Sequence, residues 1–282
     1  MDKKRTRNSY NNLDSYDDEL EIVLDLLERA ERVEREITKE FEGALRDLCK
    51  LYKEWFPFYY PKNVINEREL QKLTLSLNYG IMETDINDVL DEIKNKVEQL
   101  QTNRLMAWLI LDYELTAQKT AASIGVPNEK LKILPFSTKR DIVVQSWSKD
   151  HKTFLDRIKA NTRDMDAKLR YVIVEGFRNG WSIEKMSETF RTITGAAAYK
   201  AARLVRTETM AVYSKATKET FLENGIEYVE IIGDAACGGI CLDYVGEALP
   251  LREAEIGDDL PPYHPNCACS FCAYTEFEEE ER

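Results

Sequence analysis

The amino-acid sequence predicts a mainly α-helical protein, with elongated N-terminal helices and a C-terminal helical domain that ends in a small β ribbon with a zinc-knuckle-like site. Three observations support this fold class. Apolar residues recur every three or four positions over much of the 282 residues, which is the period of an amphipathic helix. A β-like run appears only after residue 225, and five of the six cysteines follow it, between Cys237 and Cys272.

The first predicted helix extends from Glu19 to Trp55. Its apolar stripe advances by steps of three or four residues throughout, so it needs a partner along its whole length. The aromatic segment WFPFYYP follows, and its two prolines, Pro57 and Pro61, are expected to end the helix. Residues 1–18 begin with a run of basic side chains, and we expect them to form a flexible arm.

A second helical region is predicted over residues 67–120, where apolar residues again keep a helical spacing and residues 105–111 are apolar on all sides. Glycine and proline residues between 124 and 137 then indicate a connector. The sequence therefore predicts an N-terminal helical region, residues 19–136, with a domain boundary after it.

The remainder is expected to form a helical part, residues 137–225, followed by a small β subdomain, residues 226–275, and an acidic tail, residues 276–282. Ser182 is a candidate helix cap, and the Asn224–Gly225 pair is a typical helix end. The expected helices are 142–158, 169–177, 181–190 and 196–224, and the expected strands are 228–232 and 270–274.

The charge distribution is uneven. The formal net charge of −12 argues against non-specific wrapping of nucleic acid by the whole chain. Between Lys139 and Glu219, however, 17 Lys and Arg stand against 10 Asp and Glu, a net charge of +7. This stretch indicates a face that meets an anion or an acidic partner, or else an ordinary solvated helix surface. We expect no membrane-spanning helix, because no apolar run approaches ~20 residues. We also expect no secretory signal, because the basic N-terminus leads into an acidic amphipathic stretch where such a signal would have an apolar segment.

The cysteine-rich region has the spacing of a metal site. Cys237 and Cys241 form one pair, and His264, Cys267 and Cys269 follow after 22 intervening residues. Two short turns that each supply two soft ligands can face each other across a ribbon and enclose a tetrahedral zinc ion. Four of these five residues would be ligands, with Cys269 competing with Cys267, and a site with four protein ligands is structural rather than catalytic.

A structural zinc site is not the sole chemistry open to these cysteines. They could form two disulfides or remain as reduced thiols, and Cys272 is expected to point into a small core. A zinc deaminase would need a glutamate two residues after the histidine, where this chain has Asn266. A zincin is excluded because the chain has no HExxH motif. The second histidine, His151, lies in a region that we expect to be helical, as a surface or capping residue.

From about residue 172 onward, the chain resembles the phage Mu F-like minor head proteins, which are head morphogenesis proteins of tailed bacteriophages. The resemblance depends on motifs that occur here in the family's order. They are the helix LVRTETMAVYSKA with Arg206, Thr207 and Glu208, then Asn224-Gly225, Asp234-Ala-Ala-Cys237 with Cys241, Gly246, and the string PPYHPNCAC over 261–269. The chain departs from the family in having a CxxxC pair and in having Ala268 where an arginine is usual.

This resemblance implies a virion component, inside the head near the portal, that is made in the host cytoplasm. It implies binding to the portal protein and to capsid or scaffold proteins, support of procapsid assembly and of DNA packaging or ejection, contact with packaged double-stranded DNA, and no enzymatic activity.

For the motif residues we expect a structural role. Arg206 would pair with a carboxylate such as Asp234, and Glu208 with another partner, so that the two residues clamp the helix to the ribbon. Two alternatives remain. One is a zinc-ribbon nucleic-acid-binding protein. The other is a metal-dependent nuclease or hydrolase that uses Glu208 and Asp234.

Overall fold

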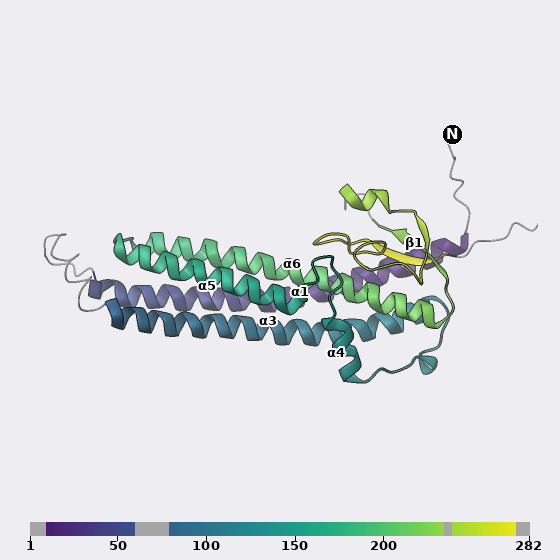
Figure 1. Ribbon diagram of the computed structural model, residues 1–282, viewed down its shortest axis with the longest axis horizontal. Coiled ribbons are helices and arrows are strands. Elements are labelled where there is room, and N and C mark those ends of the chain that lie inside the picture. Colours follow the sequence, from purple (N-terminus) through teal and green to yellow (C-terminus); the bar gives the residue numbers. More distant parts are fainter. Residues whose placement is uncertain (1–9, 60–78, 234–238, 275–282) are drawn as a thin grey trace, which may run out of the picture. The chain divides into compact units, whose positions relative to one another are not determined.

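The computed structural model describes residues 10–59, 79–233 and 239–274. Within these residues the protein is mainly helical, with a small three-stranded antiparallel sheet near the C-terminus (Figure 1), so the predicted fold class is confirmed. The elements, in order, are α1 (Tyr10–Tyr59), α3 (Tyr79–Ser123), the 3₁₀ turn η1 (Asn128–Lys130), α4 (Phe136–Val144), α5 (Phe154–Arg178), α6 (Ile183–Glu223), β1 (Tyr228–Ile232), the 3₁₀ turn η3 (Gly239–Asp243), β2 (Ala248–Pro250) and β3 (Ser270–Tyr274).

The chain divides into two compact units, and neither is a continuous segment. The first unit combines Met1–Arg32, Leu105–Phe154 and Arg203–Arg282, and the second combines Val33–Arg104 and Leu155–Ala202. The boundary that we predicted after residue 136 therefore falls inside the first unit. The physical reason is that α1, α3 and α6 are long enough for each to contribute to both units.

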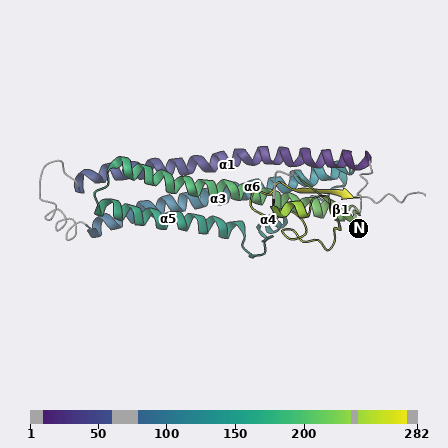
Figure 2. The same cartoon turned by 90° about the horizontal axis from the view of Figure 1, so that it is seen from above.

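The second unit is a bundle of four helical segments from α1, α3, α5 and α6, which run side by side in Figures 1 and 2. Arg104 of α3 lies 3.3 Å from Glu36 of α1. Asn161 of α5 donates a 3.0 Å hydrogen bond to a carbonyl of α6. Its apolar stripes meet in a core that includes Ile37, Phe41, Leu48, Leu90, Ile93, Ile158, Leu169 and Phe190.

In the first unit, the C-terminal half of α6 is the central element. Residues 207–214 are buried on every side of the helix, as expected for a helix enclosed by other elements. The sheet has the order β2-β1-β3, with Val229 opposite both Leu249 and Ala273. Phe221 of α6 packs edge-to-face on Phe271 of β3, with ring centroids 6.2 Å apart, and so joins the helix to the sheet.

Several predicted helix limits were wrong. α1 begins at Tyr10, inside the predicted flexible arm, and passes Pro57 to end at Tyr59. A proline this close to a helix end removes only one hydrogen bond of the last turn. The predicted helix 142–158 is instead the end of α4, a loop containing His151 with φ 55°, and the start of α5. The predicted helix 169–177 is part of α5.

The helix caps of α6 were predicted correctly, although the helix itself was expected in two pieces. The Lys185 N–H donates to the Ser182 hydroxyl over 3.2 Å, which is the hydrogen bond of an N-cap. At the other end Gly225 has φ 79°, and the Ile226 N–H donates to the Phe221 carbonyl over 3.0 Å. Such an end is typical of a glycine in the left-handed conformation.

Candidate metal centre

Three segments of the first unit meet at the cysteine cluster: η3, the turn that leads into β3, and the end of β1. Cys241 lies in η3, and His264, Cys267 and Cys269 lie in the turn that leads into β3. Because β3 pairs with β1 in a register that sets Ser270 opposite Ile232, the residue before Ser270 comes next to the residue after Ile232. Strand pairing therefore brings Cys269 to Gly233.

The thiols of Cys241, Cys267 and Cys269 form a buried cluster. Their sulfur atoms all lie within 4.8 Å of one another, and the Cys241 and Cys267 Sγ atoms are 3.7 Å apart. Two thiolates bound to one tetrahedral ion at about 2.3 Å would be about 3.8 Å apart. The three cysteines can therefore hold a metal ion with little movement.

His264 is positioned as a fourth candidate ligand. Its Nε2 atom lies 3.1 Å from Cys241 Sγ, and its Nδ1 atom lies 2.9 Å from the Pro265 carbonyl oxygen. Since a carbonyl oxygen can only accept, the Nδ1–H group donates to it, and Nε2 is the ring nitrogen that lies beside the Cys241 sulfur. A hydrogen bond of this kind on the remote ring nitrogen is typical of metal-binding histidines.

The surroundings of Cys267 favour its thiolate form. A side-chain hydrogen bond from Cys269, together with backbone N–H groups and the Cys241 thiol, outweighs burial and lowers the pKa of Cys267 from 9.0 to about 5. Conversely, burial and the neighbouring sulfurs raise the pKa of the Tyr263 phenol above its usual value. Thiolates are the form of cysteine that binds metal, so the lowered pKa of Cys267 favours a cation at this residue.

Gly233 allows Cys269 to enter the cluster. A Cβ atom at this position would lie only 2.7 Å from Cys269 Sγ and 3.3 Å from Val245 Cγ2. The first separation is shorter than a carbon–sulfur contact allows, and the second is tight for two carbon atoms. The absence of a side chain at Gly233 is therefore a condition for the close approach of β1 to the thiol.

One hydroxyl joins the cysteine turn to α6. The Asn266 N–H donates to Thr207 Oγ1 over 3.1 Å, and that hydroxyl donates to the Arg203 carbonyl over 2.7 Å. Asn266 has φ 62°, a left-handed conformation that asparagine adopts more readily than most residues. The turn residue and the helix residue, 59 positions apart in the chain, are thus in direct contact.

Not all predicted site residues can be compared with the structure. Cys237 and Asp234 lie outside the described residues. Of the two cysteines that we considered as competitors, Cys267 and Cys269, both belong to the cluster. Cys272 is buried on β3, as predicted, and burial raises the pKa of its thiol from 9.0 to about 12.

Disulfides are absent among the cysteines that the structure describes. These cysteines are Cys49, Cys241, Cys267, Cys269 and Cys272.

Arg206 and Glu208 contact other elements of the first unit. The Arg206 guanidinium lies 4.0 Å from a carboxylate oxygen of Glu31 in α1. The Glu208 carboxylate is buried and accepts a 3.0 Å hydrogen bond from the Trp147 indole. The predicted clamp between these two residues and the ribbon stays a prediction, whereas Thr207, which lies between them, makes the contact to the cysteine turn.

Sequence reasoning missed three contributors to the site: Thr207, Gly233 and Trp147. Thr207 was quoted only as the middle of a motif, and Gly233 only as one of several turn glycines. The sequence contains no signal that would pair Trp147 with Glu208 across 61 residues, because that contact depends on how the loop before α5 folds over α6.

Comparisons of the chain with protein-family models, with curated proteins and with solved structures find no match in any of the three. None of the helices in the described ranges combines the length and apolar character that crossing a bilayer would require. The fold and the site together define a helical protein with a small antiparallel ribbon and a buried cluster of three cysteines beside a histidine.

Proposed function

We propose that this chain is a minor head protein of a tailed bacteriophage, which binds the portal vertex and supports procapsid assembly and DNA packaging or ejection. The observation that carries the proposal is the hydrogen bond between Asn266 N–H and Thr207 Oγ1. It joins the HPNCAC turn to the RTE helix, the two motifs on which the resemblance depends. Two motifs that have little specificity alone are expected to touch if they belong to one site.

The proposal includes a zinc ion held by four of Cys237, Cys241, His264, Cys267 and Cys269. The sulfur spacing of 3.7 Å and the 3.1 Å approach of His264 Nε2 to the Cys241 sulfur support zinc, which prefers thiolate and imidazole ligands in a tetrahedron. The ribbon has a small apolar core of its own, centred on Val229, Ile231 and Phe271. Metal binding worth on the order of 10 kcal/mol would make that ribbon rigid enough for a mechanical role in the head.

Elemental analysis of the purified full-length chain tests the metal. We expect about one zinc ion per molecule, and we expect Cys267→Ser to lose most of it. Cys49→Ser is the matched control, because Cys49 is a half-buried free thiol of α1 outside the cluster. A wild-type protein without zinc, or equal zinc in Cys267→Ser and the wild type, would show that the assignment is wrong.

Portal binding is tested separately. The tagged chain should retain the portal protein encoded in the same genome when the two are co-expressed, and deletion of its gene should yield particles of reduced infectivity. If the two proteins elute independently and the deleted phage forms normal infectious heads, the chain is not a minor head protein, whatever metal it holds.

The nucleic-acid-binding alternative has one specific observation in its favour, the net charge of +7 between Lys139 and Glu219. Phosphate contacts of that stretch would make the affinity for duplex DNA fall steeply with salt. A salt-insensitive affinity, or none, would exclude DNA binding as the primary role.

A further inference from the structure

A buried carboxyl group lies near the start of α1, in the first unit. Within residues 17–21 the side chain of Glu19 is buried, and the other side chains are exposed. The next buried residues, Ile22 and Val23, belong to the apolar stripe of the helix. Over residues 17–21, the attachment of α1 to the rest of the unit therefore depends on one carboxyl group.

Hydroxyl groups of α3, α6 and β3 connect to this carboxyl group. The Ser123 hydroxyl, at the end of α3, lies 3.1 Å from Glu19 Oε1, and the Tyr213 hydroxyl of α6 bonds to Oε2. The Tyr213 hydroxyl also bonds to Ser270 Oγ, at the start of β3. Glu19 therefore joins the start of α1 to two helices directly and to the sheet through a tyrosine.

The number of protons in this network favours a protonated carboxyl group. The Ser123 hydroxyl has one proton but faces two oxygen atoms, Glu19 Oε1 and the Thr120 carbonyl oxygen, which is 2.8 Å away. A carboxylate and a carbonyl can only accept, so with ionised Glu19 a single proton must serve both contacts. With protonated Glu19, the carboxyl group donates to Ser123 and the hydroxyl donates to Thr120. Both contacts are then complete hydrogen bonds.

The titratable groups around this carboxyl group are acids rather than cations. They are Asp18 on α1 itself, the Tyr213 phenol of α6 and the Cys272 thiol of β3, which in turn lies beside Glu230 of β1. A buried charge that lacks a partner of opposite sign is strongly unfavourable. Burial accordingly raises the pKa of Glu19 from 4.5 to about 7.

We propose that the start of α1, residues 10–21, is a pH-dependent latch, which is closed when Glu19 is protonated and opens when that proton passes to the solvent. Opening exposes the carboxylate to water, which hydrates its charge. It stops before Ile22, because the next turns of α1 are held independently. Leu26 is buried there, and Lys119 of α3 pairs with Asp25 over 2.6 Å. This inference does not depend on the portal or on the metal.

Hydrogen exchange of the full-length chain, followed by mass spectrometry, tests the latch. Wild type is compared with Glu19→Gln, because glutamine donates and accepts as the protonated carboxyl group does but does not titrate. Comparison at one pH cancels the direct effect of pH on amide exchange. At about pH 5 we expect similar rates for residues 10–21 in both proteins, and at about pH 7.5 a rate at least about tenfold higher in the wild type. Amides of α5, in the second unit, should show no such difference.

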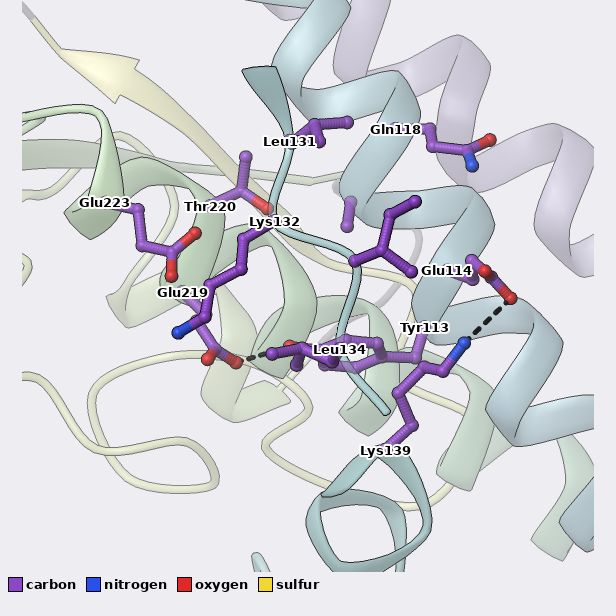
Figure 3. A pocket seen from close by; sticks show the side chains of 12 residues that line it. Tyr113, Glu114, Gln118, Leu131, Lys132, Leu134, Lys139, Glu219, Thr220 and Glu223 are labelled. Atoms are coloured by element: carbon purple, nitrogen blue, oxygen red, sulfur yellow. Dashed lines mark hydrogen bonds and ion pairs between the residues drawn. The ribbon is translucent and has the colours of Figure 1, made fainter. Parts of the chain in front are cut away.

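Glu219→Gln is the matched control. Glu219 of α6 also accepts a hydrogen bond from a tyrosine, Tyr113 of α3 (Figure 3). It is half-buried, however, and lines a pocket of about 120 Å³, so water can hydrate its charge. This variant should exchange like the wild type over residues 10–21 at both pH values, with circular dichroism confirming that both variants are folded.

A measurement on the wild type alone makes the test independent of the variants. Protection of residues 10–21, relative to that of α5 in the same sample, should fall by at least about tenfold between about pH 5 and about pH 7.5. A constant ratio, equal exchange of wild type and Glu19→Gln at the higher pH, or a Glu219→Gln variant that behaves like Glu19→Gln would each overturn the proposal.

Discussion

At the scale of single residues, Thr207 shows how one hydroxyl links two distant segments. It accepts the Asn266 N–H and donates to the Arg203 carbonyl. Thr207 itself is buried, and a buried group that loses its hydrogen-bond partners costs more than a hydrogen bond gains. The contact therefore fixes the cysteine turn to a buried position of α6.

Replacing this residue tests its importance. Thr207→Val keeps the shape but removes the acceptor, and we expect the free energy of unfolding to fall by about 1–3 kcal/mol, as measured in urea. Thr192→Val is the control, since Thr192 is exposed on the same helix and bonds only to the carbonyl of Glu188 among the contacts that the structure gives it. Equal losses in the two variants would mean that Thr207 does not hold the turn.

Glu19 predicts how stability depends on pH. Its carboxylate is buried in the first unit, where it accepts hydrogen bonds from Tyr213 and Ser123, and burial raises its pKa from 4.5 to about 7. Between these values the folded protein keeps a proton that the unfolded chain has released. The contribution of Glu19 to the free energy of unfolding should therefore decrease as pH rises from about 4.5 to about 7 and then level off, a change on the order of 3 kcal/mol.

Glu19→Gln should reduce this slope in urea titrations performed at several pH values. It should not abolish the slope, because burial also raises the pKa of Asp112, which acts in the same direction. Glu21→Gln, an exposed neighbour, should keep the wild-type profile. A Glu19→Gln profile identical to that of the wild type would refute the assignment.

At the scale of elements, glycines that look alike in the sequence have opposite roles. Gly195 lies inside α6 with nothing within 4 Å of the position of a Cβ, whereas the same atom on Gly233 would meet Cys269 Sγ. We expected a helix break near the first and an ordinary turn at the second. Packing, rather than local propensity, decides both cases. Helix α6 continues through Gly195 because tertiary contacts on either side of that residue stabilise the helix.

The two glycines give a paired prediction. Gly195→Ala should raise the free energy of unfolding by about 0.5–1 kcal/mol, because alanine loses less backbone entropy in a helix. Gly233→Ala should lower it by about 1–3 kcal/mol, because β1 must move away from the cysteine turn. Thermal unfolding measures both. Changes of the same sign would contradict this account of the two sites.

At the scale of the whole molecule, the two compact units contain different structural features. The cysteine cluster belongs to the first unit, while the four-helix bundle of the second has its own core. A linear domain boundary could not be predicted correctly, because segments far apart in the sequence build each unit. The sequence shows the apolar stripe of each helix, but it does not show which element each stripe packs against.

Removal of the proposed zinc ion should therefore act locally. With a chelator such as EDTA we expect amide hydrogens of β1 and β3 to exchange faster by at least about tenfold, since the ion that joins the two cysteine-bearing turns is lost. Amides of α5, in the second unit, should keep their protection. Hydrogen exchange followed by mass spectrometry measures both segments, and equal loss of protection in both would show that the units unfold together.

The sequence by itself determined the helical class, the caps of α6, two of the three strands, and the group of residues that contains the buried cysteine cluster. These follow from short-range physics: side-chain period, capping hydrogen bonds and the spacing of soft ligands. Only the tertiary structure decided that Cys267 and Cys269 are both in the cluster, that Thr207 contacts the turn, and that the units interleave. Each of these depends on strand register and helix packing, which join residues whose distance along the chain carries no information about their distance in space.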